Sequence, residues 1–236
     1  EDDKKNINLL MEHIKISFPE ITSLLYVINQ KANDTMYDQD IICFNGKDYI
    51  MEEMDGLHFK IGAKSFFQTN SQQAKILYKK TKELSKITEN DLVYDLYTGT
   101  GTIAQYVAKI AKKVVGIDSV KEGIQAAYKN AELNNIENCT FCAGDMKEIF
   151  TDEFIAKNGT PDIIITDPPR DGMHKKVVEK ILKIGAKRIV YISCNSATQA
   201  RDLSLMDNLY KVTQIQPVDM FPQTHHVENI VVLELK

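Results

Sequence analysis

The chain has 236 residues, of which 43% are hydrophobic and 26% are charged, as in an ordinary folded globular protein. Its formal net charge of -4 provides no whole-chain electrostatic attraction for nucleic acid, although a local basic face is compatible with it. No apolar run approaches the roughly 18 residues of a transmembrane helix, and the start EDDKKN is unlike a signal peptide. We therefore expect a cytoplasmic protein with no membrane contact, and the missing initial methionine indicates a piece of a longer chain.

The four cysteines are widely spaced, at Cys43, Cys139, Cys142 and Cys194, and a reducing compartment keeps such residues as thiols. Cys139 and Cys142 form a CxxC pair. A tetrahedral metal site needs a second pair or histidines at matching spacing, and none follows. We therefore expect no metal site.

The first part of the chain predicts a small α+β section. A helix and two strands are expected at residues 7–18, 22–30 and 41–52. An NGKD turn lies at 45–48, and a further helix is expected at 71–86. We place the boundary of this section near Leu57, which divides the chain into domains of residues 1–57 and 58–236.

From about Asp91 onward, strand-like runs alternate with amphipathic helical segments, as in a parallel sheet covered by helices. The expected strands are 92–97, 113–118, 139–144, 162–166, 188–193, 212–218 and 229–235. The expected helices are 102–112, 120–135, 175–185 and 196–207. No helical pattern separates the last two strands, so they are predicted to pair antiparallel. The fold class is α/β, with a seven-stranded, Rossmann-like sheet.

The first strand of this sheet leads into DLYTGTGTIA, residues 95–104, where an acidic residue precedes a glycine-rich turn and a helix. Doubly wound folds use such a turn to bring backbone close to a nucleotide-like ligand. The dinucleotide fingerprint GxGxxG would need a glycine where Ala104 stands, and the carboxylate of Asp95 would repel a pyrophosphate. A ligand with a positive charge and ribose hydroxyls, such as S-adenosylmethionine, suits this turn better.

Carboxylates also end the next two strands. Asp118 could accept hydrogen bonds from a ribose, and Asp145 could bind an adenine amino group. These residues could instead only cap the helices that follow. We favour a ligand site because all of them fall at the carboxyl edge of one sheet, where ligands bind.

The fourth strand ends in DPPRDG, residues 167–172. Two consecutive prolines stiffen the backbone and remove amide donors, so the chain leaves the sheet extended, with Asp167 and carbonyl groups toward the cleft. A plain turn is the alternative. After a buried strand in this order of elements, we favour a functional role.

The fifth strand delivers Cys194 to the same edge, before a helix whose dipole favours a thiolate. A free cysteine is more often core filling, but this position makes Cys194 a candidate nucleophile. The segment FPQTHHVE, which ends at Glu228, lies between the last two strands. Its adjacent histidines, His225 and His226, would point to opposite faces of a strand and form a poor chelating pair. Glu228 could be a simple charge at the end of a strand.

Five segments occur in order and at fitting spacing: FKIGAKSFFQTN (59–70), DLYTGTGTIA, ITDPPRDGMH (165–174), YISCNSATQARDL (191–203) and DMFPQTHHVE (219–228). Together they resemble the RNA uracil-5 methyltransferases, which make 5-methyluridine in ribosomal or transfer RNA. The resemblance covers residues from about 45 to 236. It implies a class I methyltransferase fold with S-adenosyl-L-methionine as the cofactor.

The resemblance also implies roles for individual residues. Cys194 matches the nucleophile of the family and Glu228 its general base. Positions that line the cofactor and target-base pocket are matched by Gln68, Tyr97, Asp118, Asp145 and Asp167. Gly99, in the glycine turn, completes the expected cofactor site.

The reaction needs these residue types. Carbon 5 of uracil is a poor nucleophile toward a methylsulfonium, and thiolate addition at carbon 6 supplies the missing electron density. A base must then remove the proton from carbon 5. We expect Asp167 to hold polar groups of the ring, Arg170 to stabilise charge on an oxygen, and Phe221 or Phe67 to stack on an extruded base.

The sequence departs from the family in several places. Members commonly have Glu at the position of Asp118 and often His at the position of Gln223, and neither change removes a reacting group. The RNA-binding barrel and iron–sulfur cysteines found in family members have no counterpart, so we expect the catalytic portion of a longer protein.

The identity of the substrate is less defined. We expect RNA as the partner, 23S rRNA first and tRNA as the alternative, and a monomer. Two other interpretations stay open. One is an amino-group methyltransferase acting on adenine or glutamine through the DPP turn, which needs no cysteine. The other is a noncatalytic RNA-binding module.

Overall fold

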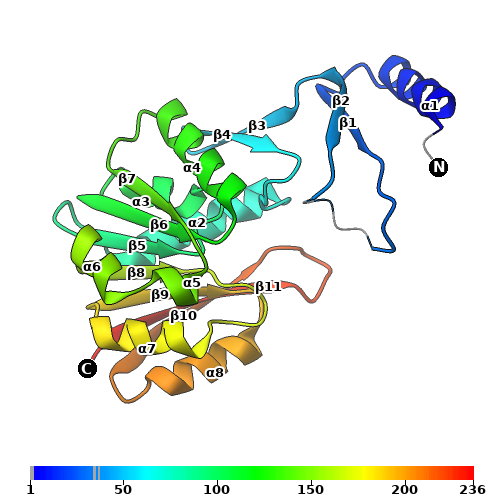
Figure 1. Ribbon diagram of the computed structural model, residues 1–236. Helices are drawn as coiled ribbons and strands as arrows, with labels where there is room; N and C mark the ends of the chain where they lie inside the picture. Colours follow the sequence, from blue (N-terminus) through cyan, green and yellow to red (C-terminus); the bar gives the residue numbers. More distant parts are fainter. Residues whose placement is uncertain (1–2, 34–35, 37) are drawn as a thin grey trace.

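Seven strands form the central sheet, in the order β10-β11-β9-β8-β5-β6-β7 (Figure 1). The strands are β5 Leu92–Leu96, β6 Lys113–Asp118, β7 Cys139–Ala143, β8 Ile163–Thr166, β9 Arg188–Ser193, β10 Tyr210–Asp219 and β11 Val227–Leu235. Only β11 runs against the others, because it pairs antiparallel with both β9 and β10. The seven-stranded α/β class and the antiparallel last pair are confirmed. The computed structural model describes residues 3–33, 36 and 38–236.

Helices cover both faces of this sheet, which explains why its central strands are apolar on both faces. The first core cluster joins one face to α2 Ser71–Ser85, α3 Thr102–Ala108 and α4 Lys121–Leu133. The second joins the other face to α5 Met146–Ile149, α6 Asp152–Asn158, α7 Lys175–Ile184 and α8 Ser196–Met206. On β8 the alternation is direct, since Ile163 and Ile165 belong to the first cluster and Ile164 to the second.

Strand order places a crevice at the carboxyl end of β5. β6 and β7 lie on one side of β5, and β8, β9 and β11 on the other. Open α/β sheets bind ligands where the strand order reverses in this way, because the helices that follow neighbouring strands lie on opposite faces there. The fold therefore directs attention to the loops after β5, β6, β8 and β9.

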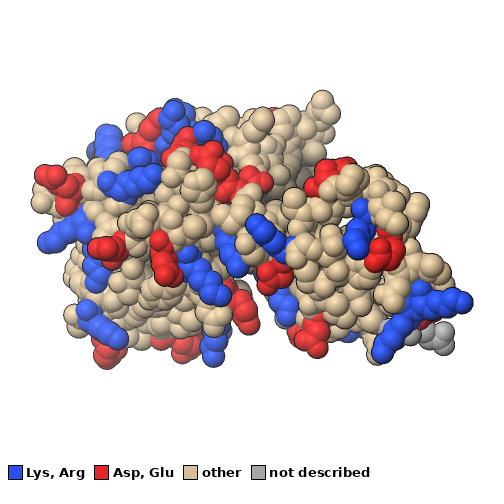
Figure 2. Space-filling view, turned by 90° about the horizontal axis from the view of Figure 1, so that it is seen from above, with Lys and Arg blue, Asp and Glu red and all other residues tan. Residues whose placement is uncertain are grey.

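The N-terminal elements, α1 Lys4–Ser17, β1 Ser23–Val27 and β2 Ile41–Gly46, lie to one side of the large sheet (Figure 1). β1 and β2 pair antiparallel with each other. The side chain of Asp3 caps α1 by accepting a hydrogen bond from the amide of Asn6. The face of the molecule in Figure 2 carries Lys and Arg interspersed with Asp and Glu, so charge of one sign does not dominate it.

A second hairpin follows, made of β3 Tyr49–Met54 and β4 Leu57–Gly62. Here the predicted strand over 41–52 is wrong, because the NGKD turn ends β2 and β3 pairs with β4 in a different sheet. β4 is not among the predicted elements, and neither are the short helices α5 and α6. The chain reverses at Asp55 and Gly56, which both have positive φ, a dipeptide typical of tight hairpin turns.

The boundary expected near Leu57 falls at the start of β4. Leu57, at 2% exposure, and Phe59, at 0%, lie in the first core cluster. The hairpin also bonds to α4 and the residue after it, since Asn130 accepts from the amide of Lys60 at 2.8 Å and Asn134 from that of His58 at 2.7 Å. The division of the chain stays a prediction, which truncation tests.

No helix in the described part of the chain is long and apolar enough to cross a membrane.

Candidate active site

A cavity of about 490 Å³ opens at the carboxyl edge of the parallel strands, and we call it the site cavity. Its walls come from the loop before α2, the glycine turn after β5, the end of β6, the DPP turn after β8, the turn after β9 and the start of β11. Six expected site residues line it: Gln68, Tyr97, Gly99, Asp118, Asp167 and Cys194. Glu228 lines it as well, so both proposed reacting side chains meet the same space.

Asp95 of β5 holds the glycine turn in place through hydrogen bonds. Its Oδ2 atom accepts hydrogen bonds from the Thr98 hydroxyl at 2.5 Å and from the Ala104 amide at 3.0 Å, which ties both ends of the turn to β5. Asp95 is fully buried and is not among the residues that line the site cavity. The Asp95 carboxylate therefore holds the turn in place and does not line the space in which a ligand would bind.

The glycines of this turn have different tasks. Gly101 has φ +77°, and a Cβ there would lie 2.9 Å from Ala127 and 3.0 Å from Phe141, so the turn packs directly against α4 and β7. Gly99 has φ +56°, and a Cβ there would meet nothing within 4 Å. Gly99 therefore leaves its backbone open to the cavity that it lines.

Asp118, at the end of β6, faces the same turn. Its Oδ2 accepts a hydrogen bond from the Gly99 amide at 2.9 Å, and its Oδ1 accepts from the Val120 amide at 2.8 Å. An ionised carboxylate has about four acceptor positions, so these two bonds orient the group and leave capacity for ligand hydroxyls. The expected ribose contact of Asp118 stays a prediction.

Asp145 behaves differently from Asp118. It caps α5 by accepting from the Lys147 amide at 3.1 Å, and it forms an ion pair with the Lys147 ammonium at 3.1 Å. Hydrogen bonding to Lys147 lowers the pKa of this exposed carboxyl group. The structure does not bring Asp145 to the lining of the site cavity, so the capping role considered as the alternative describes what is seen. Its adenine contact stays a prediction.

Cys194 follows β9 and precedes Asn195, the residue that caps α8. The Asn195 side chain accepts from the Ala197 amide at 3.1 Å, and the Ser193 hydroxyl accepts from the Asn195 amide at 3.0 Å. These bonds hold the turn in one conformation. The thiol is half-buried and lies at the amino-terminal end of a helix, where a negative charge is favoured.

Glu228 reaches the same place from β11. The antiparallel register pairs Asn229 with Ser193, so Glu228 and Cys194 are the next residues outward at one edge of the sheet. Gln199 of α8 secures this edge by donating to the Tyr191 carbonyl at 2.9 Å and to the Asn229 carbonyl at 3.1 Å. Proximity of Cys194 and Glu228 is therefore a consequence of sheet pairing.

The carboxyl groups in the site cavity influence one another. Burial, together with the negative charges of Glu228 and Asp95, raises the pKa of Asp167 well above its ordinary value. Burial also raises the pKa of Glu228, and the nearby guanidinium of Arg170 acts against that rise. A carboxyl group whose pKa is raised is a stronger base when ionised, which suits proton removal.

Arg170 and Phe221 lie outside the lining of the site cavity, close to His226. Arg170 Nη2 is 3.3 Å from His226 Nδ1, and the rings of Phe221 and His226 meet edge to face with centroids 6.4 Å apart. The Arg170 carbonyl accepts from Asn195 at 3.1 Å, which fastens the DPP turn to the start of α8. Both residues keep their expected substrate roles as predictions.

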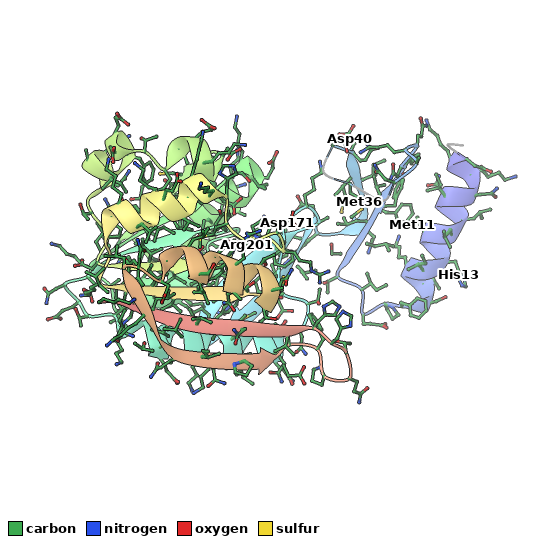
Figure 3. The ribbon with its side chains drawn as sticks, turned by 90° about the horizontal axis from the view of Figure 1, so that it is seen from below. Met11, His13, Met36, Asp40, Asp171 and Arg201 are labelled. Atoms are coloured by element: carbon green, nitrogen blue, oxygen red, sulfur yellow. The ribbon has the colours of Figure 1, made fainter. Side chains whose placement is uncertain are left out.

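Sequence reasoning missed the network that holds the DPP turn. Asp202 is fully buried, and its Oδ2 accepts from the Tyr191 hydroxyl at 2.8 Å and the Met173 amide at 2.7 Å. Arg201 donates to the Asp171 carbonyl at 2.9 Å, and both residues are labelled in Figure 3. The segment YISCNSATQARDL contains Arg201 and Asp202, but a network across distant loops has no local sequence signal.

The lining of the site cavity holds further residues that sequence reasoning did not single out. Tyr78 of α2 lines it and is buried, and Lys64, Ser65 and Ser119 lie at its loops. Across residues 3–33, 36 and 38–236, no group of three or more His, Cys, Asp or Glu is placed to hold a metal ion.

A family model described as tRNA (Uracil-5-)-methyltransferase matches residues 35–236. The chain belongs to this family. Among its relatives is an uncharacterized RNA methyltransferase of Bacteroides thetaiotaomicron, 61% identical over 227 residues, which cover 96% of this chain and 50% of the relative. Another, of Porphyromonas gingivalis, is 56% identical over 234 residues, covering 98% of this chain and 50% of the relative. The chain thus spans about half the length of the curated relatives it matches.

One solved structure agrees with this family membership, and a second shares the fold. The crystal structure of Pyrococcus abyssi tRNA (uracil-54, C5)-methyltransferase with S-adenosyl-L-homocysteine has a TM-score of 0.80 and 35% identity, covering 93% of this chain and 52% of that one. Trm5b of Pyrococcus abyssi, with a TM-score of 0.65 and 16% identity over 96% of this chain and 68% of that one, shares the fold. As a tRNA (uracil-5-)-methyltransferase family member, the chain has the expected class I methyltransferase fold.

Proposed function

We propose that this chain carries out the methyl-transfer step of an RNA uracil-5 methyltransferase that uses S-adenosyl-L-methionine. The observation that supports this most directly is the meeting of Cys194, Glu228 and Asp167 in one cavity with the glycine turn and Asp118. A nucleophile, a base and a nucleotide-type cofactor site are the three parts that carbon-5 methylation needs. Family membership and the fold support the same reaction.

The residues present fit the cofactor. Gly99 presents open backbone, and Asp118 has acceptor capacity for ribose hydroxyls. Tyr97 also lines the site cavity. Its backbone has φ +65°, a left-handed conformation that a bulky residue adopts only where the surrounding structure enforces it. Gln68 lines the cavity from the loop before α2. When bound, S-adenosyl-L-methionine supplies an electrophilic methyl group.

Side chains of this protein carry out the remaining steps, which are nucleophilic addition and proton removal. The thiolate of Cys194 forms a bond to carbon 6 of the uracil, and the electron pair of the 5,6 double bond moves onto the ring as an enolate. Carbon 5 would then take the methyl group, and the pair of electrons of the broken methyl–sulfur bond would stay on the cofactor, which would leave as S-adenosyl-L-homocysteine. Glu228 removes the proton from carbon 5, the electron pair returns to the ring, and the bond between carbon 6 and sulfur breaks to restore the thiolate. Atoms and charges balance, with one proton left on Glu228.

Further residues serve the base. Asp167 lines the site cavity and offers carboxyl oxygens to the polar groups of the ring, and its raised pKa favours its protonated form more than in a free carboxyl group. Arg170 stabilises the charge that develops on a ring oxygen, and an aromatic ring stacks on a base extruded from the RNA, either Phe67, which lines the site cavity, or Phe221, which lies outside its lining. Asp145 is the expected partner of the adenine amino group.

The target RNA is the finer part of the proposal. The sequence resemblance favoured 23S rRNA over tRNA, whereas the matching family description and the Pyrococcus abyssi structure both name tRNA. The deciding experiment incubates the full-length protein and labelled cofactor with total RNA from a strain that lacks the gene. Mapping the labelled nucleotide identifies both the RNA class and the uridine.

The mechanism is tested by Cys194→Ala and Glu228→Gln, with exposed Cys43→Ala as the matched control. Cys194→Ala is expected to lower methyl transfer by roughly 10³-fold or more while cofactor binding persists. Glu228→Gln is expected to leave RNA attached to the protein, because the adduct forms but its proton stays on carbon 5. A denaturing gel detects that attachment.

Other outcomes support the competing interpretations. Substantial transfer by Cys194→Ala would indicate an amino-group methyltransferase acting through the DPP turn. RNA binding by the unaltered protein without any methyl transfer would indicate a noncatalytic module.

A further inference from the structure

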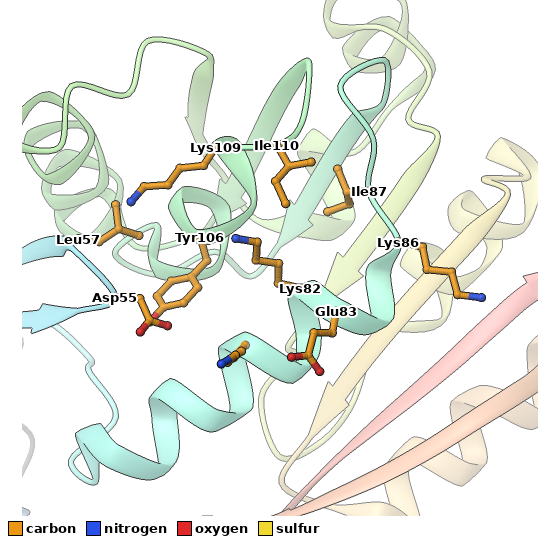
Figure 4. A pocket seen from close by; sticks show the side chains of 10 residues that line it. Asp55, Leu57, Lys82, Glu83, Lys86, Ile87, Tyr106, Lys109 and Ile110 are labelled. Atoms are coloured by element: carbon orange, nitrogen blue, oxygen red, sulfur yellow. The ribbon is translucent and has the colours of Figure 1, made fainter.

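A second cavity, of about 530 Å³, lies between α2, α3 and the turn that joins β3 to β4, and no step of the proposed reaction uses it (Figure 4). Its floor is apolar and includes Leu57, Ile87 and Tyr106. Four lysines line it: Lys79, Lys82, Lys86 and Lys109. We call it the lysine cavity.

Four lysines outnumber the two carboxylates that line the lysine cavity, although the charge of Lys79 acts on both carboxylates. Two carboxylates line it, but Asp55 pairs with Lys75 at 2.7 Å and Glu83 pairs with Lys80 at 2.8 Å, and neither lysine partner lines the cavity. None of the four lining lysines has an ion pair with a carboxylate in the part of the chain that the structure describes. The cavity therefore presents unpaired ammonium groups, in a protein whose net charge is -4.

Three of the lysines lie along α2 and at its end. Lys79 and Lys82 share a face of α2 at three-residue spacing, and Lys86 is the left-handed residue that ends the helix, with its side chain directed away from that of Lys82 (Figure 4). They span about 10 Å along the helix axis. Lys109 faces them from the end of α3. The positive charge is thus a strip and not a single point.

The lysine cavity adjoins the site cavity. Tyr78 of α2 lines the site cavity, and its ring packs on that of Tyr106, which lines the lysine cavity, with centroids 5.5 Å apart. On α3, Ile103 lines the first cavity and Tyr106, one turn later, the second. This tilted pair of rings, with an interplanar angle of 55°, lies between the two cavities.

We propose that the lysine cavity binds phosphate groups of the substrate RNA, on the strand that continues from the nucleotide in the site cavity. This inference rests on the proposed function. Ammonium groups on flexible stems attract phosphates without reading base sequence, and contacts of this kind hold the strand in register. A strip of lysines beside a site for one extruded nucleotide suits a chain of phosphates better than a single anion.

The test compares two triple variants that change the net charge equally. Lys82→Glu, Lys86→Glu and Lys109→Glu alter the lysine cavity, whereas Lys129→Glu, Lys176→Glu and Lys211→Glu alter exposed lysines elsewhere. Binding of a fluorescein-labelled oligouridylate to the full-length protein is followed by anisotropy at several salt concentrations. We expect the cavity variant to raise Kd by about tenfold or more and to reduce the salt slope by roughly 2, since single-stranded contacts contribute about 0.7 each. Equal weakening by both variants would overturn the proposal.

Lysine protection provides a measurement on the unaltered protein. Acetylation with and without the oligouridylate, read by mass spectrometry, is expected to show protection of Lys79, Lys82, Lys86 and Lys109 but not of Lys129 or Lys211. No protection by RNA would overturn the proposal. Protection by millimolar inorganic phosphate equal to that by RNA would also overturn it, by showing a site for a free anion.

The two proposals fail separately. Methyl transfer with unprotected cavity lysines would remove the RNA contact and leave the reaction intact. Protected lysines without methyl transfer would remove the reaction and leave an RNA-binding surface. Binding of S-adenosyl-L-homocysteine to the cavity variant, measured by calorimetry, shows that its fold persists.

Discussion

Asp95 shows how one buried side chain links the glycine turn to the pH dependence of the protein. Its Oδ2 atom accepts two hydrogen bonds, whereas its buried Oδ1 atom has no hydrogen-bond partner among the described residues. Burial raises the pKa of the group to about 7. The unpartnered oxygen fits this direction, because a proton there removes the charge that burial disfavours.

This raised pKa predicts a particular pH dependence of stability. The folded state holds the proton to a higher pH than the unfolded chain does, so this group stabilises the fold less as the pH rises from about 4 to about 7. In Asp95→Asn that titration is absent. We expect its unfolding free energy, from urea titrations, to fall less between about pH 5 and pH 8 than that of the unaltered protein, by up to about 3 kcal/mol.

Asp219→Asn is the control for this experiment, since that carboxyl group is exposed. Asp167, whose pKa is also raised, contributes in the same direction to all three proteins. Equal pH slopes for Asp95→Asn and the unaltered protein would contradict the role assigned to Asp95.

At the scale of elements, the glycine turn is where a loop, two helices and two strands meet. Gly101 starts α3 in close contact with α4 and β7, whereas Gly99 looks into the site cavity. The two residues lie two positions apart in the sequence but have different roles. Gly101 allows close packing, whereas Gly99 leaves space for a ligand.

Alanine at each position separates these properties. Gly101→Ala meets Ala127 and Phe141 and has a left-handed backbone, so we expect a loss of roughly 2–4 kcal/mol in unfolding free energy. Gly99→Ala meets no atom and is expected to lose only about 1 kcal/mol, from its backbone conformation. Its methyl group enters the site cavity, so S-adenosyl-L-homocysteine should bind more weakly. Thermal unfolding and calorimetry measure the two effects, and the reverse order of stability would refute this division.

At the scale of the whole molecule, the two large core clusters begin late in the chain, although Met11 and Leu24 before them are also buried. Both core clusters start at Met54 or after it, although α1, β1 and β2 precede that residue. Leu9, Leu10 and Ile16 of α1 are exposed. The hairpin β3–β4 packs in the core cluster of the large sheet. A domain boundary between β2 and β3 is therefore an alternative to the expected boundary near Leu57.

Two truncations decide between these divisions. A chain that starts at residue 47 keeps Met54 and the hairpin, and we expect it to unfold within a few degrees of the full chain. A chain that starts at residue 58 lacks β3 and the buried side chains of Met54 and Leu57. Each lost apolar side chain costs about 2–5 kcal/mol of unfolding free energy. We therefore expect its melting temperature to be lower than that of the full chain by at least about 5 to 10 °C. Equal melting temperatures by circular dichroism would support the division near Leu57.

Much of the architecture was determined by the sequence alone. Alternating apolar runs and amphipathic segments predicted the seven strands of the large sheet and six of the helices, all but α5 and α6 of those described, because hydrogen bonding within an element imposes its period locally. Cys194, Asp118 and Asp167 were found by the same logic, since each directly follows or ends a strand of known direction. The turn at Asp55 and Gly56 and the strand β4 that follows it are not among the predicted elements, and the boundary expected near Leu57 falls at the start of that strand.

Only the tertiary structure decided which of these residues share a space. The β9–β11 register brings Glu228 beside Cys194, the end of β7 leaves Asp145 outside the site cavity, and the Asp202 network holds the DPP turn. The lysine cavity likewise needs α2, α3 and a hairpin turn at once. Such contacts join residues that are far apart in the chain, so no local period encodes them, and packing of the complete core determines their geometry.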